Sequence, residues 1–491
     1  MRGGVVRVLF RILVAALGLV SGAHAVRTET PVTCDLGPLV YRGAGAGDLT
    51  RRTALGPIFE TLRAPSDDAF AAVRPLYSRI RQPARDSQRH ELLWPVGVSR
   101  TLGHERAWRF LSVFGFDADI ADPASRRRTW AFPLVFVGQD ARERGYFAVF
   151  PLGGQVREFL TFDTATFVLF PLYLHTTQND TEAYNILWPV LSWGRGDGTR
   201  QFRVFPLYGE SVSEGRWRKR FVCWPFWTSV RYDHPGSEGG GFILFPLYGH
   251  AAVGDETETW MVLPPFFRYS RGPRHTALNC PWPFVRYESG QRERLYLWPL
   301  WGRRTIGPVR SWFVLWPLVS GERIERRRET AKRFVLLPFV QHEAVYAVDP
   351  AEGEAAAPRE RNLKLWPLFG YERRGDDCRW RVLDLWPFKH AAAVDRNYAP
   401  FWTLVQHAEV GDARQDEVLW GLYRRREEAD GAKRLSLFPL YASSYGGDAG
   451  PEDVESEWRV LMGLFGYRRE GLRRTWRLLY WLRWRQEVEP E

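Results

Sequence analysis

The chain has 491 residues, of which 68 are basic and 57 acidic, and its formal net charge is +11. Aromatic residues make up 15% and apolar residues 45% of it, which excludes an intrinsically disordered protein. Most basic residues are arginines in turns that also hold Asp and Glu, as in residues 325–329. Such mixed turns are typical of solvated surfaces, so nucleic acid is not an expected partner. An anionic envelope component, a lipid head group or a polysaccharide, is compatible with the net charge.

The first 25 residues are typical of a cleavable signal peptide. An arginine-containing start precedes an apolar run over residues 12–20, and Ala23 and Ala25 fit a small-x-small cleavage site. The apolar run is too short for a membrane-spanning helix. We therefore expect removal of residues 1–25 and export of residues 26–491 to the periplasm, the outer membrane or the cell surface. An uncleaved N-terminal anchor is the alternative.

An apolar core of an aromatic residue, proline and leucine then returns about every 19 residues along almost the whole chain. Alignment on the proline gives about 24 units between Pro38 and Tyr480. A fixed period of this kind is the signature of repeat architectures. The aromatic and proline residues of the clearest units form the predicted structural repeat core: Trp94, Pro95, Phe150, Pro151, Phe170, Pro171, Trp188, Pro189, Trp224, Pro225, Phe245, Pro246, Trp298, Pro299, Trp316, Pro317, Trp366, Pro367, Trp386, Pro387, Phe438 and Pro439.

Each unit has β character, because Val, Leu, Phe, Trp and Tyr fill the cores while Gly, Asp, Asn, Arg and Ser fill the intervals. We expect one strand per unit, with the proline near mid-strand at a bend, an edge or a bulge. One strand face is broadly apolar and the other carries a narrower apolar waist, so the regularly placed aromatic residues are expected in the core. Residues 67–72 are the best helix candidate, and residues 347–361 are predicted to be a loop insertion.

The predicted fold is all-β: one continuous domain over residues 26–491, built as an antiparallel meander that forms a curved multi-sheet or barrel-like array. A large outer-membrane β-barrel is the first alternative, and a solenoid or propeller is the second. Prolines facing lipid would leave strand carbonyls without donors, and neither strand face is clearly polar, so both observations disfavour the barrel.

The sequence has no phosphate-binding loop, nucleophile elbow or zinc-protease motif. Its histidines are scattered singly along the chain. We therefore predict no catalytic, cofactor-binding or metal-binding residues. Four cysteines, Cys34, Cys223, Cys280 and Cys378, can form one or two disulfides or remain free thiols. These features predict a non-enzymatic cell-envelope scaffold or binding protein. A pore or lipid-handling barrel is the alternative, and a carbohydrate-active enzyme is a weaker third hypothesis.

Overall fold

The computed structural model describes residues 34–487 apart from residues 46–48, 123–124, 160, 197, 235–237, 255–256, 350–352, 355–356 and 447–454. The predicted signal peptide therefore lies outside the described residues. The fold is all-β, as predicted, and an antiparallel meander connects almost every strand to its neighbours in the chain. Among the described helices, none is long and apolar enough to cross a membrane.

The strands have the following bounds. In the first third of the chain they are β1 Cys34–Leu36, β2 Val40–Ala44, β3 Thr50–Ala54, β4 Phe59–Arg63, β5 Ala69–Val73, β6 Tyr77–Gln82, β7 Ser87–Leu92, β8 Gly97–Leu102, β9 Glu105–Phe110, β10 Phe114–Asp119, β11 Arg127–Ala131, β12 Val135–Gln139, β13 Gly145–Val149, β14 Gly153–Phe159 and β15 Phe162–Val168. In the second third they are β16 Tyr173–Gln178, β17 Thr181–Ile186, β18 Leu191–Gly196, β19 Thr199–Val204, β20 Tyr208–Ser213, β21 Trp217–Val222, β22 Trp227–Tyr232, β23 Gly239–Leu244, β24 Tyr248–Val253, β25 Thr257–Val262, β26 Phe267–Gly272, β27 His275–Asn279, β28 Val285–Gly290, β29 Arg292–Leu297, β30 Trp301–Ile306 and β31 Val309–Val314.

In the last third they are β32 Val319–Arg326, β33 Glu329–Leu336, β34 Val340–Asp349, β35 Gly353–Glu354, β36 Glu360–Leu365, β37 Phe369–Arg374, β38 Asp377–Val382, β39 Val405–Val410, β40 Ala413–Val418, β41 Tyr423–Glu427, β42 Lys433–Leu437, β43 Tyr441–Tyr445, β44 Glu455–Val460, β45 Phe465–Glu470, β46 Arg473–Leu478 and β47 Leu482–Glu487. The short helices are η1 Pro83–Arg85, α2 Ala392–Asn397, α3 Ala399–Trp402, η2 Leu419–Gly421 and η3 Leu461–Gly463.

Most repeat units contain two strands, not one. The described residues hold 47 strands, about twice the number of units, and most have five to seven residues. The prediction of a proline in mid-strand was wrong for the same reason: Pro95 lies in the turn between β7 and β8, and Pro171 in the turn between β15 and β16. Proline has no N–H to give to a strand ladder, so a turn accommodates it without the loss of a ladder bond. Most of these turns hold a cis peptide bond before the proline.

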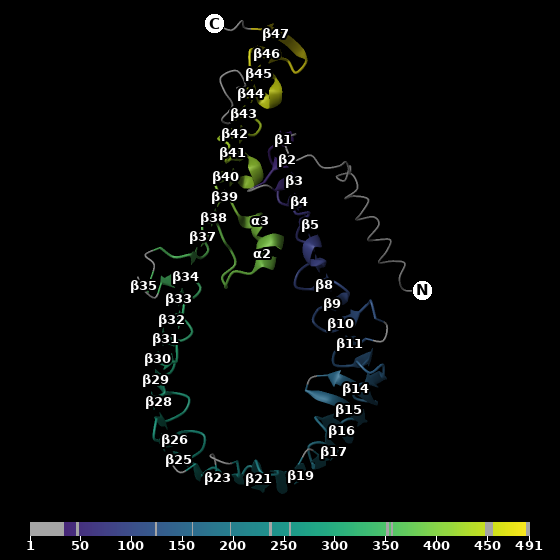
Figure 1. Cartoon of the computed structure of the whole chain (residues 1–491), viewed down its shortest axis with the longest axis vertical. Coiled ribbons are helices and arrows are strands. Elements are labelled where there is room, and N and C mark those ends of the chain that lie inside the picture. The colour runs from purple at the N-terminus through teal and green to yellow at the C-terminus, as the bar shows by residue number, and fades with distance from the viewer. Residues whose placement is uncertain are drawn as a thin grey trace.

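The sheet curls into a ring-like course whose two ends come together (Figure 1). β1 to β5 lie beside β38 to β41, with α2 and α3 between them, while β43 to β47 continue past this junction as a tail. Backbone hydrogen bonds do not close the ring, since β1 pairs only with β2, and β47 only with β46, among the described pairings. Side chains at the junction therefore hold the two ends together.

The face that looks toward α2 and α3 is the inner face of the curl. On this face a small residue can pair with a large one on the neighbouring strand, because a concave face has less room for side chains than a convex one. Gly209 pairs with Phe221, and a Cβ at Gly209 would lie 2.1 Å from the Phe221 ring. The absence of a side chain at Gly209 thus leaves room for the Phe221 aromatic ring on the inner face.

Local predictions had mixed outcomes. The helix predicted over residues 67–72 is wrong, because a turn and the start of β5 occupy those residues. Residues 350–352 and 355–356 of the insertion predicted over residues 347–361 lie outside the described residues, and the described part includes the end of β34, the short β35 that pairs back onto it, and the start of β36. In place of a further hairpin, the segment between β38 and β39 forms α2 and α3, and Trp386 and Pro387 precede α2 in it.

Candidate functional site

The aromatic-Pro-Leu turns gather along one edge of the ring, because each hairpin returns the chain to that edge. The leucines after the prolines are strongly exposed: 62% for Leu152, 60% for Leu207 and 67% for Leu368. We call this edge the apolar rim. It comprises the turns that contain Trp94, Phe132, Phe150, Phe170, Trp188, Phe205, Trp224, Phe245, Trp282, Trp298, Trp316, Trp366 and Phe438, each with its proline and the residue after it.

Aromatic rings contact one another from turn to turn along this rim. The centroids of Phe150 and Phe170 are 5.3 Å apart, and those of Phe170 and Trp188 are 5.8 Å apart. Trp298 and Trp316 are separated by 6.1 Å. The expectation that the repeated aromatics fill a core is wrong for several of them, since Trp316 is 52% exposed. The aromatic residues of the predicted repeat core therefore form a row along the apolar rim. They contact one another and are partly exposed to solvent.

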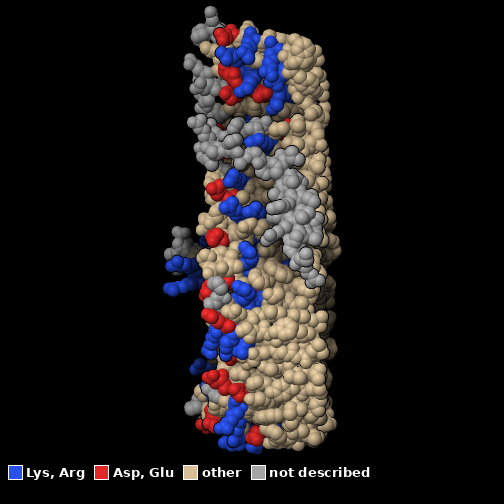
Figure 2. Space-filling view, turned by 90° about the vertical axis from the view of Figure 1, so that its right-hand side faces the viewer, with Lys and Arg blue, Asp and Glu red and all other residues tan. Residues whose placement is uncertain are grey.

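The outer face of the sheet changes from apolar to charged with distance from the rim. In β16 and β17 the row nearest the rim holds Tyr173 and its partner Ile186, whereas the row farthest from it holds Thr177 and Glu182. Figure 2 shows the same division along the whole height of the molecule: Lys, Arg, Asp and Glu gather along one long edge, and the other edge is free of them. The outer face as a whole therefore carries a polarity gradient away from the rim.

Aromatic and histidine side chains occupy the row between these two. His175 stacks on Tyr184 at 4.3 Å, and Tyr184 on Trp193 at 5.7 Å. The pattern recurs far along the chain, where Trp380 stacks on His407 at 5.3 Å. The outer surface thus has an apolar band, then a belt of amphipathic rings, then a charged band.

The junction between the two ends of the sheet, which we call the seam, is held by a buried ionic network. Glu417 of β40 accepts hydrogen bonds from Arg51 of β3 and from Arg424 of β41, the latter at 3.2 Å. Arg424 also contacts Asp35 of β1 at 3.0 Å, and its guanidinium lies 3.8 Å from the centroid of the Tyr41 ring. These contacts join strands that lie more than 360 residues apart in the chain.

Charge at the seam shifts the titration of its carboxylates. Burial raises the pKa of Glu417, but the positive charges of Arg51 and Arg424 outweigh burial and lower this pKa to about 2. The same balance lowers the pKa of Glu60, which faces Arg51 and Arg74. Both carboxylates are therefore ionised at neutral pH and attract the arginines around them.

The short helices strengthen the seam from inside the ring. Glu91 of β7, only 1% exposed, accepts a hydrogen bond from Asn397 at 2.6 Å and pairs with Arg396 at 3.0 Å. The Tyr398 hydroxyl donates to the carbonyl of Trp94 in a rim turn. The helical segment therefore bridges the late strands to β7 and to the rim.

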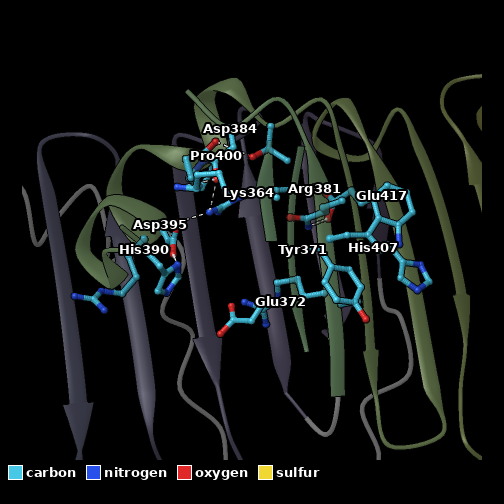
Figure 3. Close-up of a pocket in the computed structure, with 18 of the residues that line it drawn as sticks. Lys364, Tyr371, Glu372, Arg381, Asp384, His390, Asp395, Pro400, His407 and Glu417 are labelled. Atoms are coloured by element: carbon cyan, nitrogen blue, oxygen red, sulfur yellow. Dashed lines mark hydrogen bonds and ion pairs between the residues drawn. The ribbon is translucent and has the colours of Figure 1, made fainter. Parts of the chain in front are cut away.

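A second cluster anchors the helical segment to the late strands, beside a cavity of about 560 Å³ (Figure 3). Lys364 and Arg381 both contact Asp384, at 3.3 Å and 3.0 Å. Arg381 also pairs with Asp395 at 2.7 Å, and His390 lies 2.7 Å from the same carboxylate. Each acid of this cluster has a basic partner, so its evident role is to hold the segment in place.

Most sequence-predicted site residues lie in the rim, except Trp386 and Pro387, which lead into α2. The structure gives Cys34, Cys223, Cys280 and Cys378 as free thiols. No group of three or more His, Cys, Asp or Glu residues in the described part of the chain is placed to hold a metal ion. Sequence reasoning missed the seam, since its partners carry no motif and lie hundreds of residues apart.

No protein-family model matches this chain, and no curated protein matches it.

Proposed function

We propose that this protein is a non-enzymatic scaffold of the cell envelope that docks its apolar rim into one leaflet of a membrane. The observation that supports this most directly is the repeated series of exposed leucine and aromatic side chains along one edge of the ring. Large exposed apolar surfaces mark sites of interaction with proteins or membranes. The order of the outer bands favours a membrane, because Tyr and Trp prefer the interface between hydrocarbon and water.

The height of the bands fits a single leaflet. Leu172 ends a rim turn and His175 lies in the aromatic belt three residues later, which is about 10 Å along a strand. The hydrocarbon layer of one leaflet is about 15 Å thick. A spanning strand needs about 9–11 residues, more than the five to seven of most strands here, so insertion to half the depth suits the geometry better than a pore across the membrane.

The ring form suggests what the scaffold does. About 40 strands lie between the two sides of the seam, and at about 4.8 Å per strand they give a circumference on the order of 190 Å. A rim of this length, inserted in a leaflet, would surround a patch of lipid or another envelope component. Repeat proteins commonly use such extended surfaces for binding.

Vesicle flotation tests the proposal. The chain without residues 1–25 is mixed with phosphatidylcholine vesicles and centrifuged through a density gradient. We expect it to float, and we expect the double variant L207E/L247E to stay at the bottom, because both leucines are 60% exposed rim residues and carboxylates resist transfer into hydrocarbon.

The matched control is H234E/Q291E, which places two carboxylates on exposed residues outside the apolar rim. It should float like the unmodified chain. Failure of the unmodified chain to float would overturn the proposal, as would a vesicle-free dimer that L207E/L247E disrupts, since rims paired with each other would then cover the apolar surface.

A further inference from the structure

The tail that extends past the seam carries an arginine cluster on its inner face. Cross-strand pairs connect Arg424 of the seam to Ser436, Ala442 and Arg459 in turn, so these residues share one face. The same row continues from Arg459 to Gly466, then to Arg477 and Arg483. The next row holds Arg468, Thr475 and Arg485. Five arginines of these two rows, Arg459, Arg468, Arg477, Arg483 and Arg485, line a cavity of about 170 Å³ on β44 to β47.

Three of these arginines lack the carboxylates that arginines have elsewhere on this face. Arg459 pairs with Glu457 at 3.3 Å, Arg468 with Glu470, and Arg473 with Glu487 at 3.5 Å. Among the described residues, no acid pairs with Arg477, Arg483 or Arg485.

The arrangement costs stability unless an anion occupies it. Arg477 and Arg483 stand directly opposite each other on adjacent strands, and like charges in that position repel. Between Arg459 and Arg477 lies Gly466, where a Cβ would come within 3.7 Å of both side chains. The glycine leaves the space between the two arginines open.

Depth in the membrane identifies the anion. This inference rests on the proposed insertion of the rim. On the outer face of the same strands, the aromatic belt is formed by Tyr467, Trp476 and Trp484, whose row lies between the row of Arg477 and Arg483 and the row of Arg468 and Arg485 on the inner face. Tyr and Trp at a lipid interface lie at the level of the head groups. We infer that the inner face of β44 to β47 binds the phosphate of an anionic lipid head group, held by Arg477, Arg483 and Arg485.

The test compares flotation on vesicles of phosphatidylcholine alone with flotation on vesicles that also contain phosphatidylglycerol. We expect the unmodified chain to prefer the anionic vesicles, and R477Q/R483Q to lose about tenfold or more of that preference, because each basic residue near an anionic surface contributes about 1 kcal/mol. The control R469Q/R474Q removes a cross-strand arginine pair from the outer face of β45 and β46, and should retain most of the preference.

The outcomes separate this inference from the proposed function. Equal losses in the two double variants, with flotation on phosphatidylcholine intact, would overturn the head-group site and leave membrane docking standing. If the unmodified chain floats with neither kind of vesicle, membrane docking is overturned, and with it the inference that the bound phosphate belongs to a lipid. Soluble glycerol phosphate is the last arm: in excess it should compete for the site and reduce the preference of the unmodified chain for anionic vesicles, and a preference that it leaves unchanged would overturn the head-group site.

Discussion

The seam and the tail are consecutive parts of one sheet face, yet the arginines of the seam are buried and paired with acids, whereas several arginines of the tail face each other. At the seam, Arg424 is 4% exposed and contacts Asp35, Glu417 and the Tyr41 ring. In the tail, Arg477 lies on the same face and has a second arginine, Arg483, opposite it. The difference is the counter-charge: β1 and β40 supply Asp35 and Glu417 to Arg424, whereas no acid of the described residues pairs with Arg477 or Arg483. The same residue type closes the ring in one place and leaves a charged surface in the other.

The largest expected effect is at the centre of the seam. Replacement of Glu417 by Gln removes the charge between Arg51 and Arg424 and should lower the free energy of unfolding by about 3–5 kcal/mol, because each of these buried arginines loses one of its two acidic partners. Urea denaturation measures the change. In the tail, E487Q should leave the midpoint unchanged, since the Arg473–Glu487 pair is 3.5 Å long and exposed. Equal effects of the two variants would remove the distinction between the regions.

Acid should weaken the seam selectively. Glu417 has a pKa of about 2 in the folded protein and 4.5 as its ordinary value. Because the folded pKa is the lower one, its contribution is complete above pH 4.5 and is lost as the pH falls toward 2, in total about 3 kcal/mol. Thermal unfolding across this range should show a smaller loss for E417Q than for the unmodified chain. Parallel curves would mean that Glu417 is not the responsible group.

The helical bridge should matter less than the ionic centre. Asn397→Ala removes a 2.6 Å hydrogen bond to the buried Glu91 carboxylate, at a cost of about 1–3 kcal/mol. Glu91 keeps its contacts with Arg396 and Arg89, which limits the loss. Chemical denaturation provides the measurement, and T403A, which removes a half-buried hydroxyl at the end of the same helical segment, is the comparison. A T403A effect as large as that of N397A would contradict a special role for Glu91.

The smallest effect should have the opposite sign. Without lipid, Arg477→Gln relieves the repulsion from Arg483 and should leave the melting temperature unchanged or raise it slightly. Arg424→Gln at the seam should lower the melting temperature clearly, because Asp35 and Glu417 both lose a buried positive partner. Differential scanning fluorimetry of the two variants measures both changes in melting temperature. A clear destabilisation by R477Q would show that the tail arginines hold the fold together.

The sequence predicted the all-β class and the meander, because the 19-residue period and the alternation of apolar cores with polar turns are local properties. It misplaced the proline because Trp94-Pro95 and its equivalents stand among residues of high β-propensity, which conceals a turn between two short strands. The seam could not be predicted. Arg51 and Glu417 lie 366 residues apart, and only the accumulated curvature of the sheet brings them together. Rim exposure depends on that curvature too, so the repeated aromatics looked like a core.

Because each repeat contains two strands, the ring can gain or lose strands only in pairs if its turns are to stay on the same edge. A duplication or deletion of one hairpin would change the circumference by two strand spacings and would keep every aromatic-Pro-Leu turn on the same edge. A change of one strand would reverse the direction of all later strands and transfer their turns to the charged edge. Rings of this architecture can therefore vary in size only in steps of a whole hairpin, and related chains should differ in length by multiples of about 19 residues.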